Sequence, residues 1–195
     1  DRPLKVYKCE WEHEHEHEHE CDSIGSETTT RGSLVHSVLY EPIRITNSLC
    51  WSLSGEEMYL ADSPDKTIRK FEYDLREGTV ANERLMHTKP TGFPDGSVVD
   101  SEGFVWNATW RQGEGTAMVD RIDPNTGDVV FTVRLPDETS EASCCCFGGT
   151  DLDVLFVTTA HENIDPGSEP HSGGLYAVKL PLGMKGCLER RFRTG

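Results

Sequence analysis

The feature that most constrains the fold of this chain is a repeat of about 50 residues. Three times the sequence passes through an apolar strand, a Gly- or Asp-containing turn, a second strand and, after a gap, a third. Met58, Val105 and Leu155 hold equivalent places, 47 and 50 residues apart. A period of ~40–50 residues with about four strands per unit is typical of propeller blades.

Short strands separated by Gly, Asp and Asn turns, with little helical periodicity, indicate an all-β chain. The three units contain the segments WSLSGEEMYLADS, VVDSEGFVWNATW and CCFGGTDLDVLFVTTA, and a partial unit, GSLVHSVLYEPIRI, precedes them. We therefore predict an incomplete β-propeller of about three to four blades over residues 31–195.

Three and a half blades cannot close a typical ring, and an open ring exposes a strand edge and an apolar face. The chain starts with Asp1 rather than Met, which favours a fragment of a longer protein. Self-association through the open edge, or blades supplied from elsewhere, are the alternatives.

Residues 1–30 form a separate acidic, low-complexity segment that contains WEHEHEHEHEC. In an extended strand the alternation would put four His on one face, because successive side chains point to opposite sides. Such a ladder could bind Zn²⁺ or Ni²⁺ loosely. The simpler interpretation is a solvated acidic segment, since nothing nearby fixes a coordination geometry, and a tag-like or repeat-expanded stretch is a further alternative.

Charge and cysteine usage exclude several classes of partner. The chain has 34 acidic and 19 basic residues, a net charge of −15, which argues against nucleic acid or an anionic membrane. No apolar run approaches the ~20 residues of a membrane span, and the first 20 residues do not read as a signal peptide. Seven Cys, three of them consecutive and none in a CxxC pair, indicate buried, reduced thiols in a cytoplasmic protein.

Nine short strings in a fixed order carry a family resemblance. They are NSLCWS at 47–52, YLADS at 59–63, FEYD at 71–74, PDG at 94–96, SEG at 101–103, RIDP at 121–124, CCFGG at 145–149, VTTA at 157–160 and GGLYAV at 173–178. In this order and spacing they resemble the senescence marker protein/regucalcin/gluconolactonase family. The resemblance implies the C-terminal part of a six-bladed propeller.

That resemblance also implies a function and a site. Members of the family bind a divalent metal in the central channel and hydrolyse small sugar lactones. Carried over to this chain, two of the metal ligands are Asn47 and Asp95, and Asp95 is also the general base. Amide and carboxylate oxygens suit Ca²⁺, Mg²⁺ or Mn²⁺, with Zn²⁺ as a further possibility. A metal can polarise the lactone carbonyl while Asp95 takes a proton from water, so no Ser or Cys nucleophile is required.

Without the resemblance, the same residues have simpler interpretations. Asn47 at the start of a strand is a common turn residue, and Asp95-Gly96 is a β-turn signal. Asp62 and Ser63 follow a strand and are expected to bind backbone in a turn. Trp51, Trp106 and Trp110 are expected in the core or the channel wall.

The chain departs from the family pattern at several places. Nothing before Asn47 matches the first blade, so the Glu ligand has no counterpart, and the substrate-reading Arg and Asn are also missing. Ser48 stands where Gly is usual, and Cys144 where Ser is common. An insertion, RQGEG, occupies 111–115, and the loop that carries His161 and His171 is either a lid or a solvated loop.

The sequence thus predicts a metal-dependent lactonase whose partner is a small-molecule lactone. The alternative is a non-catalytic calcium- or metal-binding propeller fragment, with the His-Glu tract as an auxiliary chelator.

Overall fold

The computed structural model describes residues 4–13, 32–111, 115–165 and 167–188, with side chains from residue 37 onward. Within these residues the chain is all-β, with one turn of 3-10 helix at Ser63–Asp65. The strands are β1 (Leu4–His13), β2 (Gly32–Ile43), β3 (Thr46–Trp51), β4 (Glu57–Asp62), β5 (Thr67–Asp74), β6 (Thr79–Thr88), β7 (Phe93–Val99), β8 (Val105–Trp110), β9 (Met118–Ile122), β10 (Val129–Arg134), β11 (Ala142–Gly148), β12 (Val154–Thr159) and β13 (Leu175–Lys179).

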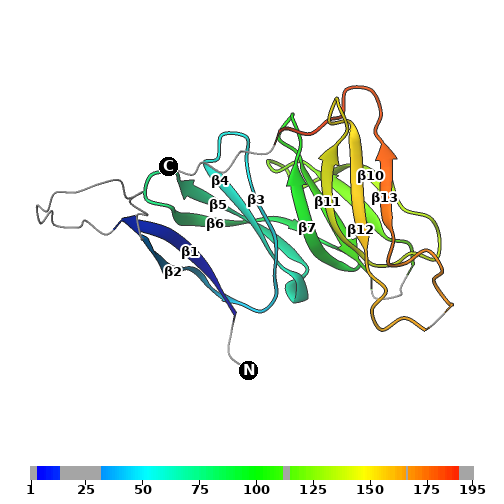
Figure 1. The fold of residues 1–195 in the computed structure, drawn as a ribbon, viewed down its shortest axis with the longest axis horizontal. Coiled ribbons are helices and arrows are strands. Elements are labelled where there is room, and N and C mark those ends of the chain that lie inside the picture. Colours follow the sequence, from blue (N-terminus) through cyan, green and yellow to red (C-terminus); the bar gives the residue numbers. More distant parts are fainter. Residues whose placement is uncertain (1–3, 14–31, 112–114, 166, 189–195) are drawn as a thin grey trace, which may run out of the picture.

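These strands form three antiparallel blades and a hairpin (Figure 1). The first blade is β3-β4-β5-β6, the second is β7-β8-β9-β10 and the third is β11-β12-β13. Each blade follows chain order, and its first strand lies innermost, so that β3 and β11 both contact β7. The predicted incomplete propeller is confirmed.

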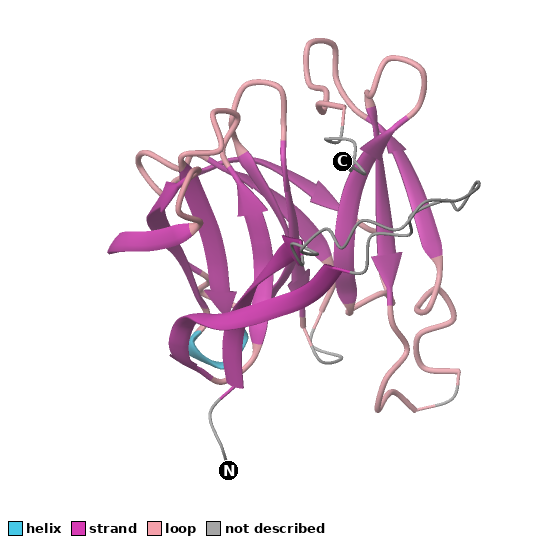
Figure 2. Ribbon diagram, turned by 60° about the vertical axis from the view of Figure 1, so that its left-hand side comes forward, coloured by secondary structure: helices cyan, strands magenta, loops and turns pink. Residues whose placement is uncertain are grey.

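The hairpin of β1 and β2 forms a fourth, two-stranded sheet that curves across the first blade (Figure 2). Leu39 and Tyr40 of β2 pack against a cluster that includes Met58 and Phe71. This hairpin accounts for the partial unit that precedes the three repeats. The division of the chain at residue 30 stays a prediction, and the His-Glu tract from residue 14 and most of the 111–115 insertion lie outside the described residues.

The core lies between neighbouring blades rather than within them. Met58, Val105 and Leu155, the equivalent positions of the repeat, are all fully buried. Tyr59, Ile68, Val105 and Ile122 pack between the first two blades, while Trp106, Val119 and Leu155 pack between the second and third. These residues lie on the second and third strands of the blades, where side chains alternate between the two faces and therefore reach the clusters on both sides. Burial of each large apolar side chain stabilises the fold by about 1.5–3 kcal/mol.

The three consecutive cysteines of β11 alternate in exposure and are not all buried as predicted. Cys145 is buried and its Sγ donates to the Trp106 carbonyl, whereas Cys144 and Cys146 are exposed. Cys187 is also exposed, so the expectation of buried thiols is wrong at three positions. Side chains at i and i+2 of a strand share a face, so only the middle cysteine can point into the core.

In the described part of the chain, no helix is long and apolar enough to cross a membrane.

Candidate functional site

A pocket of about 700 Å³ opens where β3 and β7 begin. It is lined by Ile45, Asn47, Ser63, Pro64, Phe93, Pro94, Asp95, Trp110, Glu141, Glu162 and Asn163. The two residues singled out in the sequence, Asn47 and Asp95, come from the inner strands of adjacent blades and line this same pocket. Of the tryptophans, Trp110 lies in the pocket wall, Trp106 is in the core and Trp51 is partly exposed against Tyr73.

Both residues stand where the regular strand pairing breaks. The register shifts between Asn47 and Cys50 on β3, and between Pro94 and Ser97 on β7. A bulge of this kind bends the strand and re-aims a side chain. In β3 the residue after Asn47, Ser48, has a φ of 59°, a left-handed conformation that suits the Gly of the family pattern better than Ser.

The orientation of the Asn47 amide is set by Ser63. The Asn47 Nδ2 donates to the Ser63 Oγ at 2.8 Å, and that hydroxyl donates to the Pro94 carbonyl at 2.7 Å. Since the oxygen and nitrogen of an amide point in divergent directions, this contact turns the Asn47 carbonyl oxygen away from Ser63. Ser63 binds backbone as expected, but the carbonyl that it reaches belongs to β7 of the next blade and not to its own turn, and the structure adds its contact with Asn47.

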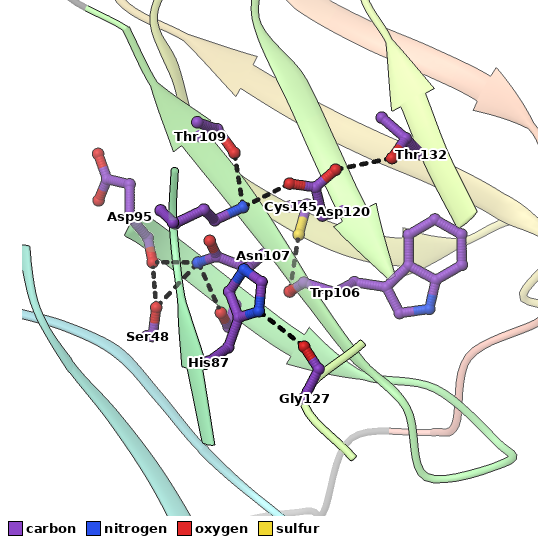
Figure 3. A network of polar contacts seen from close by, with 12 residues as sticks. Ser48, His87, Asp95, Trp106, Asn107, Thr109, Asp120, Gly127, Thr132 and Cys145 are labelled. Atoms are coloured by element: carbon purple, nitrogen blue, oxygen red, sulfur yellow. Dashed lines mark hydrogen bonds and ion pairs between the residues drawn. The ribbon is translucent and has the colours of Figure 1, made fainter. Parts of the chain in front are cut away.

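Asp95 is held by its backbone, which leaves its carboxylate directed elsewhere. The Asp95 carbonyl accepts from the Ser48 Oγ at 2.5 Å and from the Asn107 Nδ2 at 3.0 Å. Figure 3 shows the carboxylate pointing away from both partners. Burial raises the pKa of Asp95 to about 6, while a hydrogen bond from the Gly96 backbone opposes that rise. A carboxylate with a pKa near neutrality suits a general base.

The donors at this pocket fit a hard divalent cation but do not complete a site. Asn47 and Asp95 offer one amide oxygen and one carboxylate, which Ca²⁺, Mg²⁺ or Mn²⁺ accept. Among the described residues, no three His, Cys, Asp or Glu side chains gather closely enough to hold a metal. Glu141 lines the pocket too, but it is 1% exposed and its Oε2 accepts from the Glu162 backbone at 2.8 Å.

The loop after β12, residues 160–174, is anchored to the start of β11. Besides the Glu141 contact, the buried Glu169 accepts from the Ser140 backbone and hydroxyl, both at 2.9 Å, and from the Ser172 hydroxyl at 2.6 Å. His161 and His171 are exposed, whereas Glu162 and Asn163 line the pocket. The loop is therefore part of the pocket wall at one end and solvated at the other.

Two polar residues of the site could not be singled out from the sequence motifs. Asn107 is fully buried in the middle of β8 and donates to the Ser48 Oγ, the Asp95 carbonyl and the Ser97 Oγ. Lys89, 2% exposed, donates to Asp120 on β9 and to Thr109 on β8, both at 2.7 Å. The sequence signal that could have indicated a buried polar role for Asn107 is its place between apolar residues in the strand VWNATW.

Comparison with known proteins gives a consistent set of relatives. Residues 12–161 match the family described as "SMP-30/Gluconolactonase/LRE-like region". Regucalcin of Oryctolagus cuniculus is 36% identical over 152 residues, 75% of this chain and 48% of the relative, and that of Xenopus laevis is 36% identical over 165 residues, 80% and 52%. The chain thus spans about half the length of these relatives.

Solved structures agree with the sequence matches. A calcium-binding protein, regucalcin, from Agrobacterium tumefaciens superposes with a TM-score of 0.71 and 31% identity, over 83% of this chain and 56% of that one. A luciferin-regenerating enzyme gives a TM-score of 0.66 and 29% identity, over 80% and 53% of the two chains. A gluconolactonase from Xanthomonas campestris, 21% identical with a TM-score of 0.57, shares the fold.

Proposed function

Because the chain belongs to the SMP-30/gluconolactonase/LRE-like family, we propose that it is part of a metal-dependent hydrolase of small sugar lactones. The observation that carries the proposal is the convergence of Asn47 and Asp95 on one pocket from the inner strands of adjacent blades. In this proposal a further metal ligand and the substrate contacts come from outside the given sequence, which spans about half the length of its relatives. We also propose a cytoplasmic location, because the odd number of cysteines and the three consecutive ones do not suit the disulfide framework of a secreted protein.

In this proposal Asn47 and Asp95 are two of the ligands of a divalent cation. The cation, when bound, supplies a positive charge that polarises a lactone carbonyl and acidifies water. Asp95 accepts a proton from the attacking water, whose oxygen forms a bond to the carbonyl carbon. The ring C–O bond then breaks, and the proton passes to the leaving ring oxygen, so that one water is added and a hydroxy acid is released.

Metal titration of the chain and its variants tests this assignment. We expect Asp95→Ala to abolish binding of Ca²⁺ and Zn²⁺ in calorimetry and to abolish metal-dependent hydrolysis of an aldonolactone, while the circular dichroism spectrum is unchanged. Asp137→Asn, on an exposed turn, is the matched control and should leave both readouts as they are. Equal metal affinity and turnover in Asp95→Ala and the control would rule the assignment out.

A second candidate is a metal-binding protein without catalysis. It is favoured by the description of the Agrobacterium relative as calcium-binding and by the His-Glu tract of this chain. Deletion of residues 10–22 separates the two sources of affinity. Loss of all metal binding in the deleted chain favours a chelating tract, whereas binding that survives without lactone turnover favours a non-catalytic propeller site.

A further inference from the structure

Two buried residues outside the predicted ligand pair join the strands that carry it. We infer that Ser48 and Asn107 form a clamp that sets the relative position of Asn47 and Asp95. Ser48 and Asn107 are positioning residues, since their contacts are to the backbone and side chains around the ligands. The inference rests on the proposed function, because the ligand roles of Asn47 and Asp95 belong to that proposal.

The clamp is a closed set of hydrogen bonds between the first two blades (Figure 3). The Ser48 Oγ donates to the Asp95 carbonyl at 2.5 Å and accepts from the Asn107 Nδ2 at 2.9 Å. The same Nδ2 reaches the Asp95 carbonyl and the Ser97 Oγ, both at 3.0 Å. The contacts therefore bridge the β3 bulge after Asn47 and the β7 bulge around Asp95, at the two places where regular pairing no longer fixes the backbone.

Both members of the clamp carry a local cost. Ser48 holds a left-handed φ of 59°, which a Gly would adopt without strain. The Asn107 Oδ1 is buried and has no hydrogen-bond partner among the described residues. A buried polar atom without a partner is destabilising, so neither residue is explained by stability alone. Locally unfavourable choices of this kind concentrate at functional sites.

The repeat supplies an internal comparison. The equivalents of Asn107, two positions after Val105, are Leu60 after Met58 and Val157 after Leu155. Leu60 and Val157 are buried and apolar, with exposures of 1% and 0%. The blade therefore accepts an apolar side chain at this position, and among the three described blades only the second, which also carries Asp95, has an amide there. This amide stands where the Ser48 Oγ meets the Asp95 carbonyl, and its Nδ2 lies 2.9 Å from the first atom and 3.0 Å from the second.

Substitution of Asn107 by Leu tests the clamp with the side chain that the first blade already uses. We expect Asn107→Leu to keep or raise the urea midpoint of the metal-free chain and to weaken Ca²⁺ and Zn²⁺ binding by about 10-fold or more, the range seen when outer partners of metal ligands are removed. If Asn107 were only structural, Asn107→Leu would lower the midpoint and leave the affinity of the folded chain unchanged, which would overturn the inference.

Two substitutions at Ser48 move stability and affinity in opposite directions. Ser48→Gly relieves the left-handed strain but removes the hydroxyl, so it should raise the midpoint and weaken metal binding. Ser48→Thr keeps the hydroxyl on a β-branched residue that tolerates a positive φ poorly, so it should lower the midpoint and retain affinity. Affinity that follows the midpoint in both variants contradicts a positioning role.

Asp95→Asn distinguishes failure of the clamp from failure of the proposed function. Loss of binding in Asp95→Asn with full affinity in Asn107→Leu rejects the clamp and leaves the ligand assignment standing. Equal affinity of Asp95→Asn and the unmodified chain, or no binding of either metal by the unmodified chain, rejects both.

Discussion

The two boundaries between blades are built on the same repeat, and both contain an apolar cluster, but they differ in the polar contacts that cross them. The first boundary, where β3 meets β7, is crossed by hydrogen bonds from Ser48 and Ser63 to the carbonyls of Asp95 and Pro94. A third hydrogen bond crosses it from Asn107 to Ser48. The second, where β7 meets β11, is an apolar cluster around Trp106, Leu155 and Val157, with Cys145 among them. Because the candidate ligands lie at the first boundary, its hydrogen bonds can orient side chains in addition to the apolar packing that holds the blades together at both boundaries.

Two consecutive residues of β7 contact different neighbouring blades, Asp95 the first blade and Gly96 the third. The Asp95 carbonyl faces Ser48, while the next residue, Gly96, lies against Cys144. A Cβ on Gly96 would stand 2.6 Å from the Cys144 Sγ and 2.8 Å from its Cα, so no larger residue fits there without displacing β11. The glycine thus permits the close approach of the third blade, while its neighbour serves the pocket.

The largest effect is expected from the apolar boundary. Leu155→Ala removes a fully buried side chain and should lower the free energy of unfolding by about 3 kcal/mol. Urea denaturation followed by tryptophan fluorescence measures the loss. Metal affinity at a temperature where the variant is folded should remain that of the unmodified chain. A parallel loss of affinity would show that the two boundaries are coupled.

The next effect concerns the free-energy cost of ionising the partly buried Asp95 carboxylate at the first boundary. With a folded pKa of about 6, above the usual 3.8, folding favours the protonated form, so this group lowers stability as pH rises from about 4 through 6. Asp95→Asn should therefore raise the free energy of unfolding at pH 7, in the presence of a chelator, by about 1–2 kcal/mol, allowing for partial solvation. The gain should vanish below about pH 4. A gain that is the same at both pH values would point to a cause other than ionisation.

The repeat made the fold predictable, because a blade has to bury the same inner positions each time and Met58, Val105 and Leu155 do so. Asn47 and Asp95 were found only through the resemblance, since each alone is an ordinary turn residue. Asn107 could not be assigned a role, because its partners lie on β3 and β7, 59 and 12 residues away in sequence. The exposure of Cys144 and Cys146 could not be predicted, because the spacing of the three cysteines does not determine which face of β11 packs against the second blade.

The smallest effect is expected where β6 meets the second blade. The His87 Nδ1 contacts the Gly127 carbonyl at 2.8 Å, and its buried Nε2 has no partner within the described chain. Burial lowers the pKa of His87, although the Gly127 carbonyl opposes that change. The unfolded chain therefore binds this proton more readily, and stability is lost as pH falls from about 6.5 through the lower folded pKa.

This slope is opposite in sign to that of Asp95 over an overlapping range, so the two contributions partly cancel in the unmodified chain. Free energies of unfolding from pH 7 to pH 5 in the Asp95→Asn background should fall with acid, and adding His87→Gln should flatten that fall. A slope that is unchanged by His87→Gln would assign the acid sensitivity to other groups. A flattened slope would show that the contact of His87 with the second blade weakens when the imidazole is protonated.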